Sequence, residues 1–143
     1  MGASAAKHIL FLVLAGFVVG LVVLGIGGRV LMRLLALITP EPPRFTLSGT
    51  AQIIGTGAAW GGVTAPLLMA LARWRPRFGR AFGSFYGLVV MTPALVVFVL
   101  FSGFGGTIVA PPLFIAGTVV LFPLLFILHG LVLELITRHR AML

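Results

Sequence analysis

The chain has 143 residues, of which 60% are hydrophobic and 8% are charged. A water-soluble domain carries about 25% charged residues, so this composition leaves too few polar groups to cover a water-facing surface and excludes a soluble globular protein. Ten lysines and arginines against two acids give a formal net charge of +8. The absence of cysteine excludes disulfides and cysteine-ligated metal or iron–sulfur sites.

The first apolar stretch covers residues 9–38 and is interrupted by Arg29 and Arg33. As one α-helix it would be about 45 Å long, against a hydrocarbon core of about 30 Å. We therefore expect it to tilt, to project from the bilayer or to break, and the glycines of segment 25–28 are the expected point of a break. The stretch is too long for the apolar region of a signal peptide, so we interpret it as a retained span.

Three further apolar segments follow, at residues 49–72, 81–101 and 111–137. Each contains an internal proline, and a proline inside a helix removes a backbone hydrogen bond and kinks the helix. These prolines are Pro66, Pro93 and Pro123. The sequence therefore predicts a single domain over residues 1–143, an all-α integral membrane protein. We expect a bundle of four transmembrane helices in which spans 2–4 are proline-kinked.

The basic residues set the expected orientation, because cytoplasmic loops of membrane proteins carry an excess of lysine and arginine. With the N-terminus inside, one side collects seven of them, which are Lys7, Arg73, Arg75, Arg77, Arg80, Arg138 and Arg140. The other side holds three, which are Arg29, Arg33 and Arg44. Seven against three predicts that both termini are cytoplasmic, and we expect the protein in the inner, cytoplasmic membrane of a bacterium.

An arginine-rich segment, residues 73–80, joins the second and third spans and interleaves aromatic with basic side chains. Its residues Arg73, Trp74, Arg75, Arg77 and Arg80 form the predicted inner-face lipid anchor. Contact with nucleic acid is the alternative for such a pattern. Because the segment lies between two spans, we expect it to bind membrane lipids, including anionic lipids, and we expect no nucleic-acid partner.

Arg29 and Arg33 lie four residues apart and therefore on one helix face. If the first stretch is centred in the bilayer, Arg29 would lie about 7 Å from the midplane. If the span ends near Gly28, both side chains reach the outer headgroups. Glu41 is the acid of that side, and one carboxylate cannot neutralise three arginines, Arg44 being the third. We therefore expect an outer-leaflet site at which these arginines contact lipid phosphate or another anion.

Small residues recur at four-residue spacing and create smooth helix faces that allow close helix approach. The predicted packing positions are Gly16, Gly20, Gly57, Gly61, Gly79, Gly83 and Gly87. A separate row on the second span consists of Ala51, Gly55 and Ala59. Such rows indicate packing within the bundle or against another chain, and because several faces carry them, we expect a homo-oligomer or a membrane protein partner.

His129 lies deep in the fourth span and is a candidate ligand for haem, a metal or a quinone; the alternative is a packed, hydrogen-bonded histidine. No second histidine lies at that depth in the sequence, so we expect no metal and no cofactor. Glu134 precedes Arg138 by one turn, which predicts an ion pair at the helix end. The two acids lie near opposite faces and no nucleophile or phosphate-loop motif is present, so no catalytic residue and no enzyme activity are expected.

The sequence thus predicts a non-enzymatic small polytopic membrane protein that self-associates or acts as an accessory subunit of a larger membrane complex. The alternative is a small channel or transporter for an anion or anionic metabolite. In that alternative, Arg29 and Arg33 would line the path, and the proline-kinked spans would open it.

Overall fold

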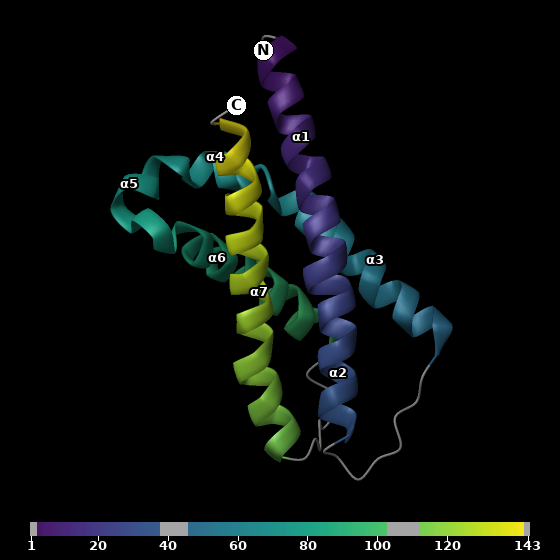
Figure 1. Ribbon diagram of the computed structural model, residues 1–143. Helices are drawn as coiled ribbons and strands as arrows, with labels where there is room; N and C mark the ends of the chain where they lie inside the picture. Colours follow the sequence, from purple (N-terminus) through teal and green to yellow (C-terminus); the bar gives the residue numbers. More distant parts are fainter. Residues whose placement is uncertain (1–2, 38–45, 103–111, 142–143) are drawn as a thin grey trace.

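The computed structural model describes residues 3–37, 46–102 and 112–141, and side chains for 5–37, 46–96 and 119–139. Within these ranges the fold consists of helices without a strand, which confirms the all-α prediction (Figure 1). The helical elements are α1 (Ala3–Val19), η1 (Gly20–Ile26), α2 (Gly27–Leu37), α3 (Leu47–Thr64), α4 (Leu67–Leu71), η2 (Ala72–Trp74), α5 (Arg75–Phe78), η3 (Gly79–Ala81), α6 (Phe82–Ser102) and α7 (Pro112–Ala141).

The elements α1, η1 and α2 form one continuous helix, and the glycines of segment 25–28 do not break it. Its middle part, η1, is a π-helix, in which the Gly27 N–H donates to the Val22 carbonyl five residues earlier. The apolar part, Ala5–Leu37, has 33 residues, which corresponds to about 50 Å of helix. Of the three outcomes expected for this segment (a tilt, a projection from the bilayer or a break), the break does not occur. In a bilayer this helix therefore has to tilt or project.

The second apolar segment is not one straight helix. The helix α3 ends at Thr64, and the runs Leu47–Thr64 and Leu67–Val96 are bent by 44°. Pro66 lies in the break between them, where its missing N–H leaves a gap in the backbone hydrogen-bond ladder. Pro93 and Pro123, in contrast, lie inside α6 and α7, and both helices continue past them.

Two helices are long and apolar enough to cross a membrane, as expected of an integral membrane protein. These are Ala5–Leu37 and Val119–His139, and the bent pair can supply a third crossing. The described residues therefore contain two or three candidate spans, where the sequence predicts four. Between α3 and α6 the chain is divided among short helices and reverses direction at α5 (Figure 1).

Glycines bring helix backbones into direct contact where the first long helix crosses α3. A Cβ atom built on Gly20 would lie 2.9 Å from the Gly61 Cα, and one built on Gly57 would lie 2.8 Å from the Gly25 Cα. Real Cβ atoms do not approach other atoms this closely, so only glycine fits these positions. The π-helical segment coincides with this crossing, since Gly20 and Gly25 both lie in it.

A second glycine crossing joins α6 to α7. A Cβ atom on Gly83 would lie 2.8 Å from the Leu131 Cα, and one on Gly130 would lie 3.0 Å from the Gly87 Cα. The long first helix and α7 run side by side, and α3 and α6 cross them (Figure 1). The core lies between these crossings and contains Leu12, Ala65, Leu68, Phe82, Tyr86, Val90 and Leu133.

Candidate functional site

The described basic residues gather at two ends of the molecule. The start of α1, the helices around α5 and the end of α7 lie at one end, which we call the terminal end (Figure 1). Direct contacts place the arginine-rich segment there, because Arg138 of α7 donates to the Gly79 carbonyl at 2.9 Å. Arg29 and Arg33 belong to α2, which runs toward the opposite end.

The arginine-rich segment folds into η2, α5 and η3 rather than one regular helix. The side chains of Arg73, Arg77 and Arg80 are exposed, so they remain available to solvent or lipid headgroups. The Arg73 guanidinium lies 5.8 Å from the centroid of the Trp74 ring. Trp74 in turn lies 5.4 Å from Phe85, centroid to centroid, which anchors the segment on α6 through an aromatic contact.

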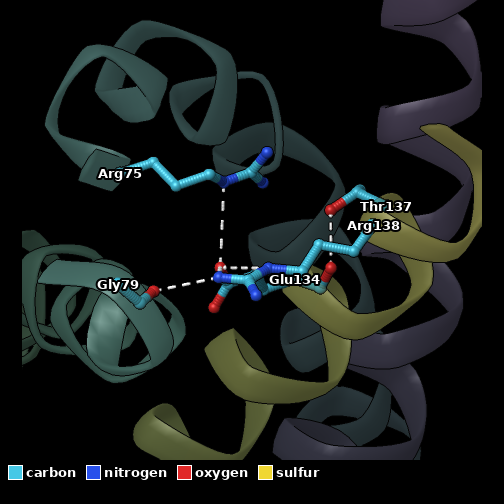
Figure 2. A network of polar contacts seen from close by, with 5 residues as sticks. All are labelled: Arg75, Gly79, Glu134, Thr137 and Arg138. Atoms are coloured by element: carbon cyan, nitrogen blue, oxygen red, sulfur yellow. Dashed lines mark hydrogen bonds and ion pairs between the residues drawn. The ribbon is translucent and has the colours of Figure 1, made fainter. Parts of the chain in front are cut away.

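Arg75 differs from the other arginines of the segment because it turns toward α7. Its Nε atom lies 3.8 Å from the Glu134 Oε1, and its guanidinium lies 5.3 Å from the Phe82 ring centroid. Glu134 also accepts from Arg138, whose Nη2 and Nε atoms lie 2.6 and 2.9 Å from the same oxygen (Figure 2). The expected ion pair between Glu134 and Arg138 is therefore present, and Arg75 is a member of it that the sequence did not indicate.

This arrangement, which we call the Glu134 clasp, consists of Arg75, Gly79, Glu134 and Arg138. The carboxylate is buried, with 4% of the residue exposed. Burial of a carboxylate is unfavourable unless it is paired, and two guanidinium groups meet that requirement here. The clasp depends on Gly83, because a Cβ atom there would lie 2.7 Å from the Glu134 Oε2.

The predicted outer arginines are described in part. Arg33 is exposed and Arg29 is half-buried on α2, whose Leu31 and Leu35 face the protein interior. Arg44 and Glu41 lie outside the described residues. The structure therefore places two of the three arginines on one helix, at a distance from the Glu134 clasp.

Six of the seven predicted packing glycines lie at the two helix crossings; these are Gly16, Gly20, Gly57, Gly61, Gly83 and Gly87. Gly79 lies elsewhere, in the connection between α5 and α6, with nothing within 4 Å of the position of a Cβ atom. Its φ of 52° and ψ of −119° are accessible to glycine and strained for other residues. Gly79 thus allows a turn instead of a close helix contact.

The row Ala51, Gly55 and Ala59 faces away from the rest of the described chain. All three residues are exposed, and nothing lies within 4 Å of the position of a Cβ atom on Gly55. Gln52 and Thr56, which neighbour this row on α3, are exposed as well. We call these five residues the outer face of α3.

His129 is fully buried and faces a second polar side chain, Tyr86 of α6. Both residues are 0% exposed, and their ring centroids lie 6.3 Å apart. Within the described residues, neither ring nitrogen of His129 has a hydrogen-bond partner, and the polar neighbour of the Tyr86 hydroxyl is Thr64. Trp60 Nε1 on α3 is a further buried donor without a described partner.

Sequence reasoning identified His129 and missed Tyr86. The available signal was that Tyr86 is the single tyrosine of the chain and lies near the start of a mostly apolar span. No group of three or more His, Cys, Asp or Glu residues occurs among the described residues. The residues present therefore do not form a metal-binding set around His129.

No protein-family model, curated protein or solved structure matches this chain. Three features of the structure bear on function. They are the outer face of α3, the arginines at both ends, and the buried pair of Tyr86 and His129.

Proposed function

We propose that this chain is a non-enzymatic integral membrane protein with four spans and both termini in the cytoplasm, which self-associates through the outer face of α3. The observation that carries the proposal is that this face is small and polar and that no described residue covers it. Different observations support the topology and the assembly.

The distribution of charge supports the topology. Lys7, the arginine-rich segment 73–80 and Arg138 belong to the terminal end, whereas Arg29 and Arg33 belong to the helix that runs away from it. An excess of basic residues marks the cytoplasmic side. The terminal end is then cytoplasmic, with exposed Arg73, Arg77 and Arg80 at anionic headgroups, and Arg29 and Arg33 contact lipid phosphate of the outer leaflet.

The chemistry of the outer face supports self-association. Helix association within a bilayer is driven by close packing and hydrogen bonds, because lipid tails are as apolar as leucine. The other rows of small residues are already used in contacts within the chain, at the two crossings. The row Ala51, Gly55 and Ala59 is not, although its small side chains would let a second helix approach equally closely.

Gln52 indicates what covers this face. Its side-chain amide is exposed and makes no hydrogen bond within the described part of the chain. A polar side chain in contact with lipid is unfavourable unless a partner hydrogen-bonds to it. Glutamine both donates and accepts, so Gln52 of one copy can pair reciprocally with Gln52 of a second copy across a two-fold axis. This self-complementarity favours a second copy of the same chain as the partner.

Cysteine crosslinking tests the proposal directly, because the chain contains no native cysteine. Ala59→Cys lies on the outer face of α3, and Leu128→Cys, on the exposed side of α7, is a matched control. In native membranes we expect a disulfide-linked dimer for Ala59→Cys and none for Leu128→Cys, together with a dimeric or larger mass of the wild type by light scattering in mild detergent.

A monomeric mass without crosslinking at Ala59→Cys would refute self-association. A crosslink from Ala59→Cys to a different protein would also refute it, and would assign the face to a partner subunit. Equal crosslinking of Ala59→Cys and Leu128→Cys would show random collision and would contradict a specific interface.

A further inference from the structure

Tyr86 and His129 form a pair of buried polar side chains that the proposed assembly does not use. Both are 0% exposed. Within the described residues, neither ring nitrogen of His129 has a hydrogen-bond partner, and the polar neighbour of the Tyr86 hydroxyl is Thr64. Burying a polar group without a hydrogen-bond partner is unfavourable. Phenylalanine and leucine would fill the same space without this penalty, so packing does not account for the hydroxyl and the imidazole.

Tyr86 belongs to a buried cluster whose other members are apolar. The helix α1 contributes Leu12, α6 contributes Tyr86 itself and Val90, and α7 contributes Leu133. From α3, Thr64 lies beside the Tyr86 hydroxyl. The Thr64 hydroxyl donates to the Trp60 carbonyl at 2.7 Å, and its oxygen can still accept from the Tyr86 hydroxyl. The buried cluster that contains Tyr86 therefore has no member with a permanent charge.

The nearest ionisable group along α7 is Glu134, which follows His129 by five residues, or about 7.5 Å of helix rise. Its Oε2 atom lies against Gly83 of α6, three residues before Tyr86. Glu134 and Tyr86 thus belong to the same interface between α6 and α7. The other charged groups near Glu134 are Arg75 and Arg138, which hold it in the clasp.

The chemistry of the pair identifies its ligand class. A neutral imidazole offers one donor and one acceptor, and a tyrosine hydroxyl offers both as well. Such a pair can receive and pass a proton. The described residues around it do not supply the ligand set of a metal. Ionisable residues within membrane spans commonly mark proton pathways.

We propose that Tyr86 and His129 form a proton-binding site in the interior of the membrane domain, and that this site exchanges protons with the terminal end past Glu134. On uptake, the proton forms an N–H bond with the unprotonated ring nitrogen of His129, beside the Tyr86 ring. The solvent at the terminal end supplies the proton, and no electron is transferred. The proposal is independent of self-association, since it concerns the inside of one chain.

Nuclear magnetic resonance of the wild-type protein tests the site without any substitution. The chain has three histidines, and His8 and His139 are exposed, so ¹⁵N-histidine labelling gives three sets of signals, with His129 assigned by its loss in His129→Gln. We expect the His129 ring nitrogens to change protonation with pH in the folded protein. A His129 signal that stays constant over the full pH range in which the fold persists would overturn the proposal.

Proton flux provides the second test, with the full chain in liposomes under a pH gradient and a pH-sensitive dye inside. We expect wild-type protein to increase the flux over empty liposomes, and Tyr86→Phe and His129→Gln to reduce this increase several-fold. His139→Gln removes an exposed histidine of the same helix and should leave the flux at the wild-type level. Equal fluxes for wild type, Tyr86→Phe and His129→Gln would refute exchange through this site.

Discussion

The crossing of the first long helix with α3 predicts that Gly61 cannot carry even a methyl group. The Cβ atom of alanine at this position would lie 2.7 Å from the Gly20 Cα and 3.1 Å from the Gly20 nitrogen, and it would also meet the Gly16 carbonyl oxygen. All these atoms are backbone, so no side-chain rotation relieves the contact. Gly61→Ala therefore requires the two helices to separate.

The size of the destabilisation by Gly61→Ala follows from these distances. Carbon atoms pack best at about 3.5–4.0 Å, so the crossing has to open by about 1 Å. Backbone contacts along the crossing weaken as it opens, and inserting a methylene into a well-packed interior is unfavourable by about 1–3 kcal/mol. Larger side chains at Gly61 should destabilise the protein further, because they require a wider separation.

The assay is reversible unfolding of the detergent-solubilised protein, followed by the loss of helical circular dichroism. Gly55→Ala is the matched control, since it makes the same chemical change on the same helix at an exposed position with nothing within 4 Å. We expect Gly61→Ala to lower the free energy of unfolding and Gly55→Ala to leave it unchanged or raise it slightly. Equal stabilities for the two variants would show that α3 does not cross the first helix through Gly61.

Three further predictions concern the charged groups and the turn. Glu134→Gln removes the charge that holds Arg75 and Arg138, and we expect it to lower the free energy of unfolding by about 1.5–3 kcal/mol, measured by the same unfolding; an unchanged stability would contradict the clasp. Gly79→Ala places a side chain at a φ of 52° and should lower the free energy of unfolding by about 1–3 kcal/mol. An unchanged free energy of unfolding would show that this turn does not require glycine. If Arg29 and Arg33 contact lipid phosphate, replacing both by glutamine should reduce the anionic lipid that is retained in native mass spectrometry. Protein-dependent anion flux in liposomes that is lost in the same double variant would instead support a channel or transporter.

The sequence alone was sufficient for the properties that depend on local pattern. Apolar runs long enough to cross a membrane predict helices, and the structure has helices over most of each predicted segment. The sequence also indicated Glu134 and Arg138 as a pair, because residues four apart on a helix are neighbours irrespective of the rest of the fold. The break near Pro66 lies where the backbone loses a donor, which is a local property as well.

The tertiary structure decided which side of each helix faces protein and which faces outward. Lipid tails and protein interiors are equally apolar, so hydrophobicity cannot distinguish Gly57 and Gly61, which contact the first helix, from Gly55, which contacts nothing. Hydrophobicity also cannot show that Arg75 turns toward Glu134 while the neighbouring arginines Arg73 and Arg77 stay exposed. The pairing of Tyr86 with His129 joins residues that are far apart in the sequence, and it follows from the glycine contacts that bring α6 against α7.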